Sequence, residues 1–77
     1  MNNFVFLVGI LTNINNGFVE LDVEDLGSIK VFIDYNDEIK KLTIGKFTKI
    51  EGELSLKFFP FPVIKANRIY QIKSNIN

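Results

Sequence analysis

Residues 18–34 read FVELDVEDLGSIKVFID and contain two runs in which apolar and polar side chains alternate. The turn signal Asp25-Leu26-Gly27 separates the two runs. Alternation with a period of two is typical of strands that pack on a core from one side. The side chains expected to face that core are Val19, Leu21, Val23, Ile29, Val31 and Ile33. Those expected to point away from it are Phe18, Glu20, Asp22, Glu24, Lys30, Phe32 and Asp34.

Upstream of this pair, residues 4–14 form a long run rich in Phe, Val, Ile and Leu, and Asn15-Asn16-Gly17 predicts a hairpin turn after it. Gly9 in the middle of the run predicts a bulge or a sharp bend. The apolar part, FVFLVGIL, lacks the positive residues and the cleavage site of a signal peptide and is too short to span a bilayer. We therefore interpret it as a buried strand and expect a soluble, cytoplasmic protein.

Downstream, the sequence predicts a short helix, because Asn36 or Asp37 can cap it and Gly45 can end it. Two strands follow. The two prolines in residues 58–62 exclude sheet pairing there, so this segment is expected to connect the two strands. The expected order is helix 37–42, strand 47–57, connection 58–62 and strand 63–72. The whole chain, residues 1–77, is thus expected to form one all-β domain. We predict a five-stranded barrel with one short helix between the third and fourth strands, which can plug the open end of the barrel.

Four segments carry a resemblance to a known superfamily. They are VGILTNI at 8–14, IKVFID at 29–34, GKFTKIEGEL at 45–54 and VIKANRIYQI at 63–72. Together they resemble the OB-fold nucleic-acid-binding superfamily, and in size the chain is similar to the small stand-alone barrels of replication-protein-A-like and telomere-capping complexes. The resemblance implies a ligand on the face of strands 2 and 3 and on the loops between strands 1 and 2 and strands 4 and 5. It specifies the fold better than the ligand, because OB barrels also bind proteins and sugars.

Composition restricts the possible functions. The 77 residues include neither histidine nor cysteine, which removes the commonest general base, thiolate chemistry and the usual zinc ligands. No metal site, cofactor or catalytic motif is predicted, and we expect no enzyme activity. The charges balance overall but are divided unevenly: residues 1–38 hold seven acidic residues and one lysine, whereas residues 39–77 hold eight basic and two acidic residues. This asymmetry predicts a distinct basic region.

The expected loop between strands 4 and 5 is the main candidate for binding. It places Phe58, Phe59 and Phe61 between Lys57 and Lys65. Single-stranded nucleic acids are bound by aromatic rings that stack on bases and by cations that contact phosphates. The alternative is that the three rings fold back and cap the end of the barrel. If the rings are exposed, the chain is expected to associate with itself or with a partner.

Phe32 and Lys30 form a second candidate on the outward face of the third strand, with Phe18 beside them. A ring and a cation two residues apart could stack on a base and neutralise a phosphate. Glu20 and Asp22 on the same face oppose this, because carboxylates repel phosphates. The alternative is ordinary cross-strand packing between surface aromatics. Tyr35 and Tyr70 are weaker candidates of the same kind.

Basic residues of the fourth and fifth strands are expected to form one stripe that includes Lys46, Lys49, Lys65, Arg68 and Lys73. Glu51 and Glu53 are interpreted as carboxylates neutralised by Lys49 and Lys57. The leading hypothesis is non-enzymatic binding of single-stranded nucleic acid, DNA ahead of RNA, weak on its own and strengthened by self-association or a protein partner, with no membrane contact. The rival hypothesis is a protein-interaction barrel within a larger complex. The residues predicted to contact nucleic acid are Lys30, Phe32, Lys49, Lys57, Phe58, Phe59, Phe61, Lys65 and Arg68.

Overall fold

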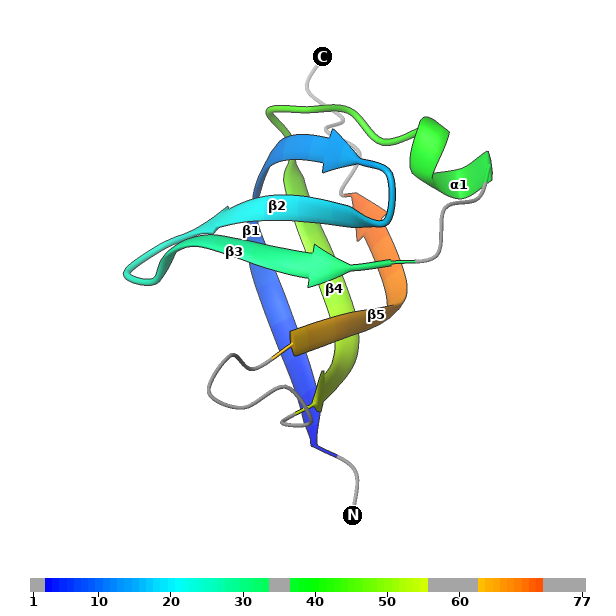
Figure 1. Ribbon diagram of the computed structural model, residues 1–77. Helices are drawn as coiled ribbons and strands as arrows, with labels where there is room; N and C mark the ends of the chain where they lie inside the picture. The colour runs from blue at the N-terminus through cyan, green and yellow to red at the C-terminus, as the bar shows by residue number, and fades with distance from the viewer. Residues whose placement is uncertain (1–2, 34–36, 56–62, 72–77) are drawn as a thin grey trace.

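The computed structural model describes residues 3–33, 37–55 and 63–71 (Figure 1). It contains five strands and one helical turn. In chain order these are β1 (Phe4–Asn15), β2 (Phe18–Val23), β3 (Gly27–Phe32), α1 (Asp37–Lys40), β4 (Phe47–Ser55) and β5 (Val63–Gln71). The expected all-β class with five strands is confirmed.

The strands form one sheet in the order β1-β2-β3-β5-β4, which closes into a barrel because β4 also pairs with β1. Four of the five strand pairs are antiparallel. The fifth, between β3 and β5, is parallel and short, and it joins Val31 to Ile64 and Phe32 to Lys65. This short pairing is therefore the point at which the β1-β2-β3 meander meets the β4-β5 hairpin.

The core lies inside the barrel and consists of aliphatic side chains from β1, β2, β3, β4 and α1. Its buried members are Leu11, Val19, Leu21, Val31, Ile33, Ile39 and Ile50. The side chains predicted to face inward from 18–34 are all buried or half-buried, as a period of two requires. Ile39 of α1 is 1% exposed and packs into the same core, so the helical turn adds a side chain to the filling of the barrel.

β1 is not the buried strand that its composition suggested. Phe4, Phe6 and Val8 are 67%, 56% and 39% exposed, whereas Val5 and Leu7 between them are half-buried. Successive side chains of a strand point to opposite faces of the sheet, and only one face of this sheet meets the core. The outward positions 4, 6 and 8 of β1 are therefore apolar and exposed.

The irregularities of the sheet lie elsewhere than expected. β1 pairs with β4 without a shift from Phe4 to Ile10, so Gly9 is not a bulge, and the shift in the β1–β2 register falls between Leu11 and Asn13. Gly9 directly precedes Ile10, the residue at which the pairing of β1 with β4 ends and its pairing with β2 begins. Figure 1 shows that β1 bends between these two partner strands. A Cβ atom there would lie 2.6 Å from the carbonyl oxygen of Asp22, so the close approach of the two strands requires glycine.

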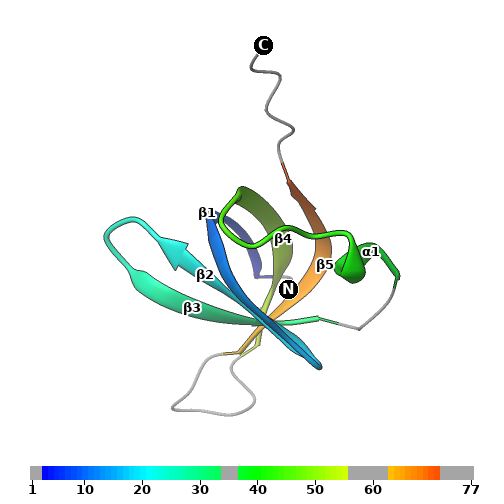
Figure 2. The same ribbon diagram turned by 90° about the horizontal axis from the view of Figure 1, so that it is seen from above.

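The segment between α1 and β4 crosses above the ring of strands (Figure 2). α1 ends at Lys40, two residues earlier than predicted, and the amide of Leu42 donates to the carbonyl of Ile39 at 3.1 Å. The side-chain amide of Gln71 fixes the segment, because it accepts from the Thr43 amide at 2.9 Å and donates to the Thr43 carbonyl at 2.8 Å. It also lies 3.0 Å from the hydroxyl of buried Thr48. The C-terminal part of β5 thereby holds the closing segment in place.

Candidate nucleic-acid interface

Two aromatic rings lie side by side on the outer face of β2 and β3. Phe18 and Phe32 are directly opposite each other in the antiparallel pair, with ring centroids 6.1 Å apart and an angle of 54° between the rings. This tilted arrangement is one that aromatic pairs prefer. Phe32 is 40% exposed and Phe18 is half-buried, so the pair presents one open ring and one supporting ring.

Lys30 belongs to this cluster. Its Nζ atom lies 4.5 Å from the centroid of the Phe18 ring on the neighbouring strand, and its action together with Phe32 on a ligand stays a prediction. The register explains the contact with Phe18, because Lys30 is directly opposite Glu20 and therefore diagonal to Phe18.

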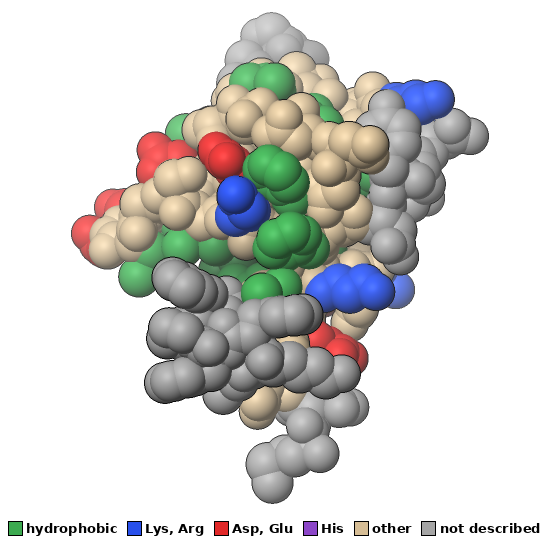
Figure 3. All heavy atoms as spheres, viewed as in Figure 1, with side chains coloured by type: hydrophobic (Ala, Val, Ile, Leu, Met, Phe, Trp, Pro, Cys, Tyr) green, Lys and Arg blue, Asp and Glu red, His purple; other side chains and the backbone are tan. Residues whose placement is uncertain are grey.

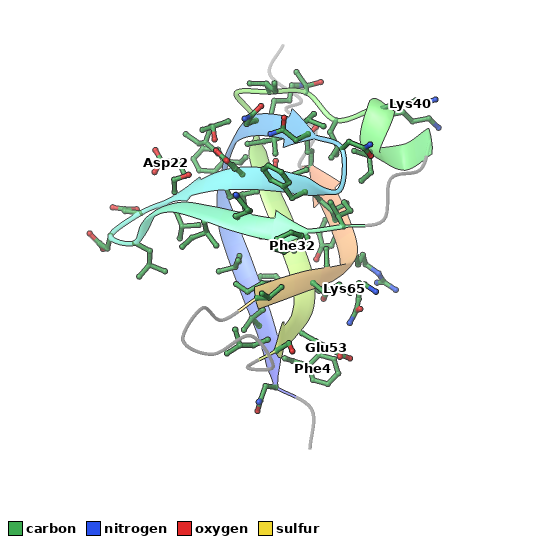
Figure 4. The ribbon with its side chains drawn as sticks, viewed as in Figure 1. Phe4, Asp22, Phe32, Lys40, Glu53 and Lys65 are labelled. Atoms are coloured by element: carbon green, nitrogen blue, oxygen red, sulfur yellow. The ribbon has the colours of Figure 1, made fainter. Side chains whose placement is uncertain are left out.

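Lys65 extends the cluster onto β5. It is the parallel partner of Phe32, and both side chains are exposed on the same side of the molecule (Figure 4). On its other side Lys65 is opposite Glu53 of β4. Phe18, Lys30, Phe32 and Lys65 together define the surface that we call the β2–β3–β5 face.

Acidic residues flank the face on the side of the β2–β3 hairpin. Glu20 is half-buried and Asp22 is exposed, and Glu24 and Asp25 follow in the turn. Figure 3 shows hydrophobic side chains gathered in the middle of this face, basic side chains on both sides of them, acidic side chains toward the hairpin, and an acidic side chain next to the basic ones at the β5 end. The face therefore has several carboxylates at the hairpin and one, Glu53, beside Lys65.

Of the predicted basic stripe along β4 and β5, the structure describes Lys46, Lys49, Lys65 and Arg68, and the stripe stays a prediction. Lys49 lies on β4, which β5 separates from β3, and it faces Val8 and Tyr70 in the neighbouring strands. The guanidinium of Arg68 lies 3.8 Å from the carboxylate of Glu51. Glu51 thus has Arg68 as its partner in place of the expected Lys49. Lys49 and Arg68 are consequently not brought together with Phe32.

The remaining predicted contact residues lie outside the described residues. These are Lys57, Phe58, Phe59 and Phe61, and the same holds for Tyr35 and Lys73. Whether the three rings stack on a ligand or cap the barrel stays a prediction. Segment 56–62 joins β4 to β5, whose pairing with β3 begins at Ile64.

A shallow hollow of about 470 Å³ lies on another part of the surface, across β1, β4 and β5. Its lining comprises Phe4, Val5, Phe6, Glu51, Asn67 and Arg68. Asn67 is the extra residue of β5 at the point where the β4–β5 register shifts. Sequence reasoning missed the exposed rings of this region, since a run in which every residue is apolar does not reveal which side chains point outward.

No three His, Cys, Asp or Glu side chains in residues 3–33, 37–55 and 63–71 are grouped as a metal ion would require. In the same ranges no helix is long and apolar enough to cross a membrane.

Comparison with solved structures reveals similar folds at low sequence identity. A structure of the Stn1–Ten1 complex from S. pombe matches with a TM-score of 0.66 and 14% identity over 96% of this chain. This chain spans 60% of the length of that one. The hypothetical protein ygiW from E. coli matches with a TM-score of 0.63 and 20% identity, over 92% of this chain and 76% of that one. No protein-family model and no curated protein matches the sequence. The resemblance to OB-fold barrels is confirmed at the level of the fold.

Proposed function

We propose that the chain is a non-enzymatic module that binds single-stranded nucleic acid, DNA ahead of RNA, on the β2–β3–β5 face. The observation that carries the proposal is the Phe18–Phe32 pair with a lysine on each side. Aromatic faces and adjacent cations are the two components by which single strands are bound without reading their sequence. The absence of histidine and cysteine from the chain supports a role in binding over one in catalysis.

The four side chains have different tasks in this proposal. Phe32 is the more exposed ring and stacks on a base, while Phe18 supports it from the opposite strand. Lys30 and Lys65 contact the phosphates before and after that base. Because Glu20 and Asp22 repel phosphate, the strand leaves the face toward β5 and not along the β2–β3 hairpin.

A weak affinity follows from the small number of these contacts. Each stacked base contributes about 1–3 kcal/mol, and a dissociation constant of 1 mM already corresponds to about 4 kcal/mol. The chain as a whole has no net positive charge to add non-specific attraction. We therefore propose that it acts within an assembly, and the similarity to a chain from the Stn1–Ten1 complex supports this role.

A second candidate function is the binding of a partner protein on the same face. The carboxylates beside the rings favour it, since Glu20 and Asp22 would complement a basic partner. Exposed aromatic residues are also common anchors of protein interfaces.

Titration with fluorescently labelled single-stranded DNA and RNA at two salt concentrations tests the proposal. Binding is expected to weaken as salt rises, because each neutralised phosphate releases counterions. Phe32→Ala is expected to weaken binding by about 1–3 kcal/mol. Phe47→Ala is the matched control, because Phe47 is 59% exposed and lies on β4, away from the face.

Lys65→Ala is expected to reduce the salt dependence of nucleic-acid binding while leaving the melting temperature of the protein unchanged. Lys49→Ala is its control, since Lys49 does not lie on the β2–β3–β5 face. If neither nucleic acid binds at low salt, the proposal is wrong and the protein-interaction function takes its place. If Phe32→Ala and Phe47→Ala reduce the affinity equally, the single-stranded nucleic acid binds elsewhere than on the β2–β3–β5 face.

A further inference from the structure

Within the described residues, the N-terminal half of β1 pairs with another strand along only one of its two edges. β4 pairs with one side of Phe4–Ile10, whereas the pairing of β2 with the other side begins only at Ile10. No strand in the described part of the chain pairs with the second edge of residues 4–9. Exposed strand edges are templates for pairing with another chain.

The backbone groups at this edge belong to the same residues as the exposed side chains. Asn3 and Leu11 form hydrogen bonds with β4, through Leu54 and Lys46 respectively. Backbone groups alternate in direction along a strand, so Phe4, Phe6 and Val8 direct theirs away from β4. Three residues therefore offer an unpaired edge together with apolar side chains on the outer face.

The edge lacks the features that prevent strands from pairing. Residues 1–19 contain no charged side chain and no proline, the two devices by which proteins commonly block their strand edges. We propose that this edge binds a second copy of the same chain, with the two β1 strands antiparallel about a two-fold axis at Phe6. The two barrels then share one continuous sheet in which β1 pairs with the partner's β1.

The register of this pairing is self-complementary. Phe6 faces the partner's Phe6, and Phe4 faces the partner's Val8. In β4, Glu53 is opposite Phe4 and Lys49 is opposite Val8. The two outer rows across the two-fold axis thus carry a carboxylate at one end and an ammonium at the other, with only apolar side chains between them. The central row carries Glu51 at both ends, separated by the two Phe6 rings. The opposite charges of the two outer rows favour a second copy of the chain over an unrelated peptide.

The surface area that the proposed interface buries sets the expected stability of the dimer. A Phe side chain buries about 200 Å², so Phe4 and Phe6, 67% and 56% exposed, leave roughly 250 Å² of ring surface per chain. A stable interface buries about 800 Å² per partner. The two rings alone bury less area than a stable interface requires. The paired edges must therefore contribute about six backbone hydrogen bonds to the interface. The dissociation constant of the dimer is therefore expected to lie in the micromolar range.

Sedimentation of the full chain over a range of concentrations tests the proposal. The wild type is expected to form dimers, and Phe6→Lys and Phe6→Glu are each expected to raise the dissociation constant about tenfold or more, because like charges then face each other at the axis. An equimolar mixture of the two variants is expected to dimerise again. Leu26→Lys is the matched control, since Leu26 is 65% exposed but lies in the β2–β3 turn.

Circular dichroism melts of all variants establish that they fold. A wild type that stays monomeric at every concentration would overturn the proposal. So would a dimer that Phe6→Lys leaves intact, or one that Leu26→Lys dissociates equally. Failure of the mixed variants to recover dimers would exclude the two-fold register at Phe6.

Discussion

Replacement of Gly52 by alanine is expected to loosen the closure of the barrel. Gly52 lies on β4 opposite Ala66, at the point where the register with β5 shifts. A Cβ atom at this position would meet the carbonyl oxygen of Lys65 inside van der Waals distance. It would also lie 3.1 Å from the carbonyl carbon of Lys65 and 3.2 Å from the Cα atom of Ala66. All three neighbours are backbone atoms, so the strand itself must move.

The expected loss of stability follows from that displacement. Overpacking commonly destabilises by about 1–3 kcal/mol and sometimes more, and we expect about 3 kcal/mol because backbone atoms cannot rotate away. For a domain of this size that loss lowers the melting temperature by roughly 10–20 °C. Lys65 is also one of the two β5 residues that pair with β3. The shift should therefore disturb the β3–β5 pairing and the position of Lys65 on the β2–β3–β5 face.

Thermal and urea denaturation followed by circular dichroism measure the effect. Gly45→Ala is the control, because a Cβ atom at Gly45 meets nothing within 4 Å and only the left-handed backbone, with φ at +95°, opposes it. That strain amounts to about 1 kcal/mol. If Gly52→Ala proves no less stable than Gly45→Ala, the steric reasoning is refuted.

Three further perturbations test other parts of the structure. Gln71→Leu removes the contacts of the amide with Thr43 and Thr48 and is expected to cost about 1–3 kcal/mol, with faster hydrogen exchange at the Thr43 amide as its local signature. Ile39→Ala is expected to cost about 2–4 kcal/mol in urea denaturation, because Ile39 is 1% exposed, whereas Ile44→Ala at a 56% exposed position should cost less than about 0.5 kcal/mol. Asp22→Asn is expected to tighten binding of single-stranded DNA by removing a repulsive charge beside the face, and unchanged or weaker binding would contradict the proposed path of the strand.

The part of the fold that could be predicted from the sequence is the part in which the hydrophobic pattern has a clear period. Residues 18–34 alternate between apolar and polar side chains, so the inward set could be named from the sequence. Residues 4–11 are apolar throughout, and nothing in such a run distinguishes the exposed Phe4 and Phe6 from their half-buried neighbours. The pairing with β4 and the packing of one face on the core decide that distinction, and both are tertiary properties.

The candidate site was predictable in its residue types and less so in its contacts. Phe32 and Lys30 point outward, as the alternation indicated, and the pairing of β5 with β3 adds Lys65 to the same face. The contact of Lys30 with Phe18 depends on the cross-strand register, which the β2–β3 turn sets. The basic stripe stays a prediction. In the register of the β4–β5 hairpin, Glu51 and Glu53 lie between Lys49 and Lys65, so carboxylates interrupt the row of basic residues.

The two proposed surfaces use different strands, which lets both be occupied at once. The proposed edge is the side of Phe4–Val8 that faces away from β4, while Phe18, Phe32 and Lys65 lie on β2, β3 and β5. A dimer through β1 thus leaves both β2–β3–β5 faces open and joins two weak sites in one particle. Binding of a long strand to the second site is then intramolecular, and the effective concentration can raise the overall affinity by about 10²–10⁴ without a new contact. A neutral chain with few contacts per copy would thereby bind a strand that spans both sites much more tightly than one copy can.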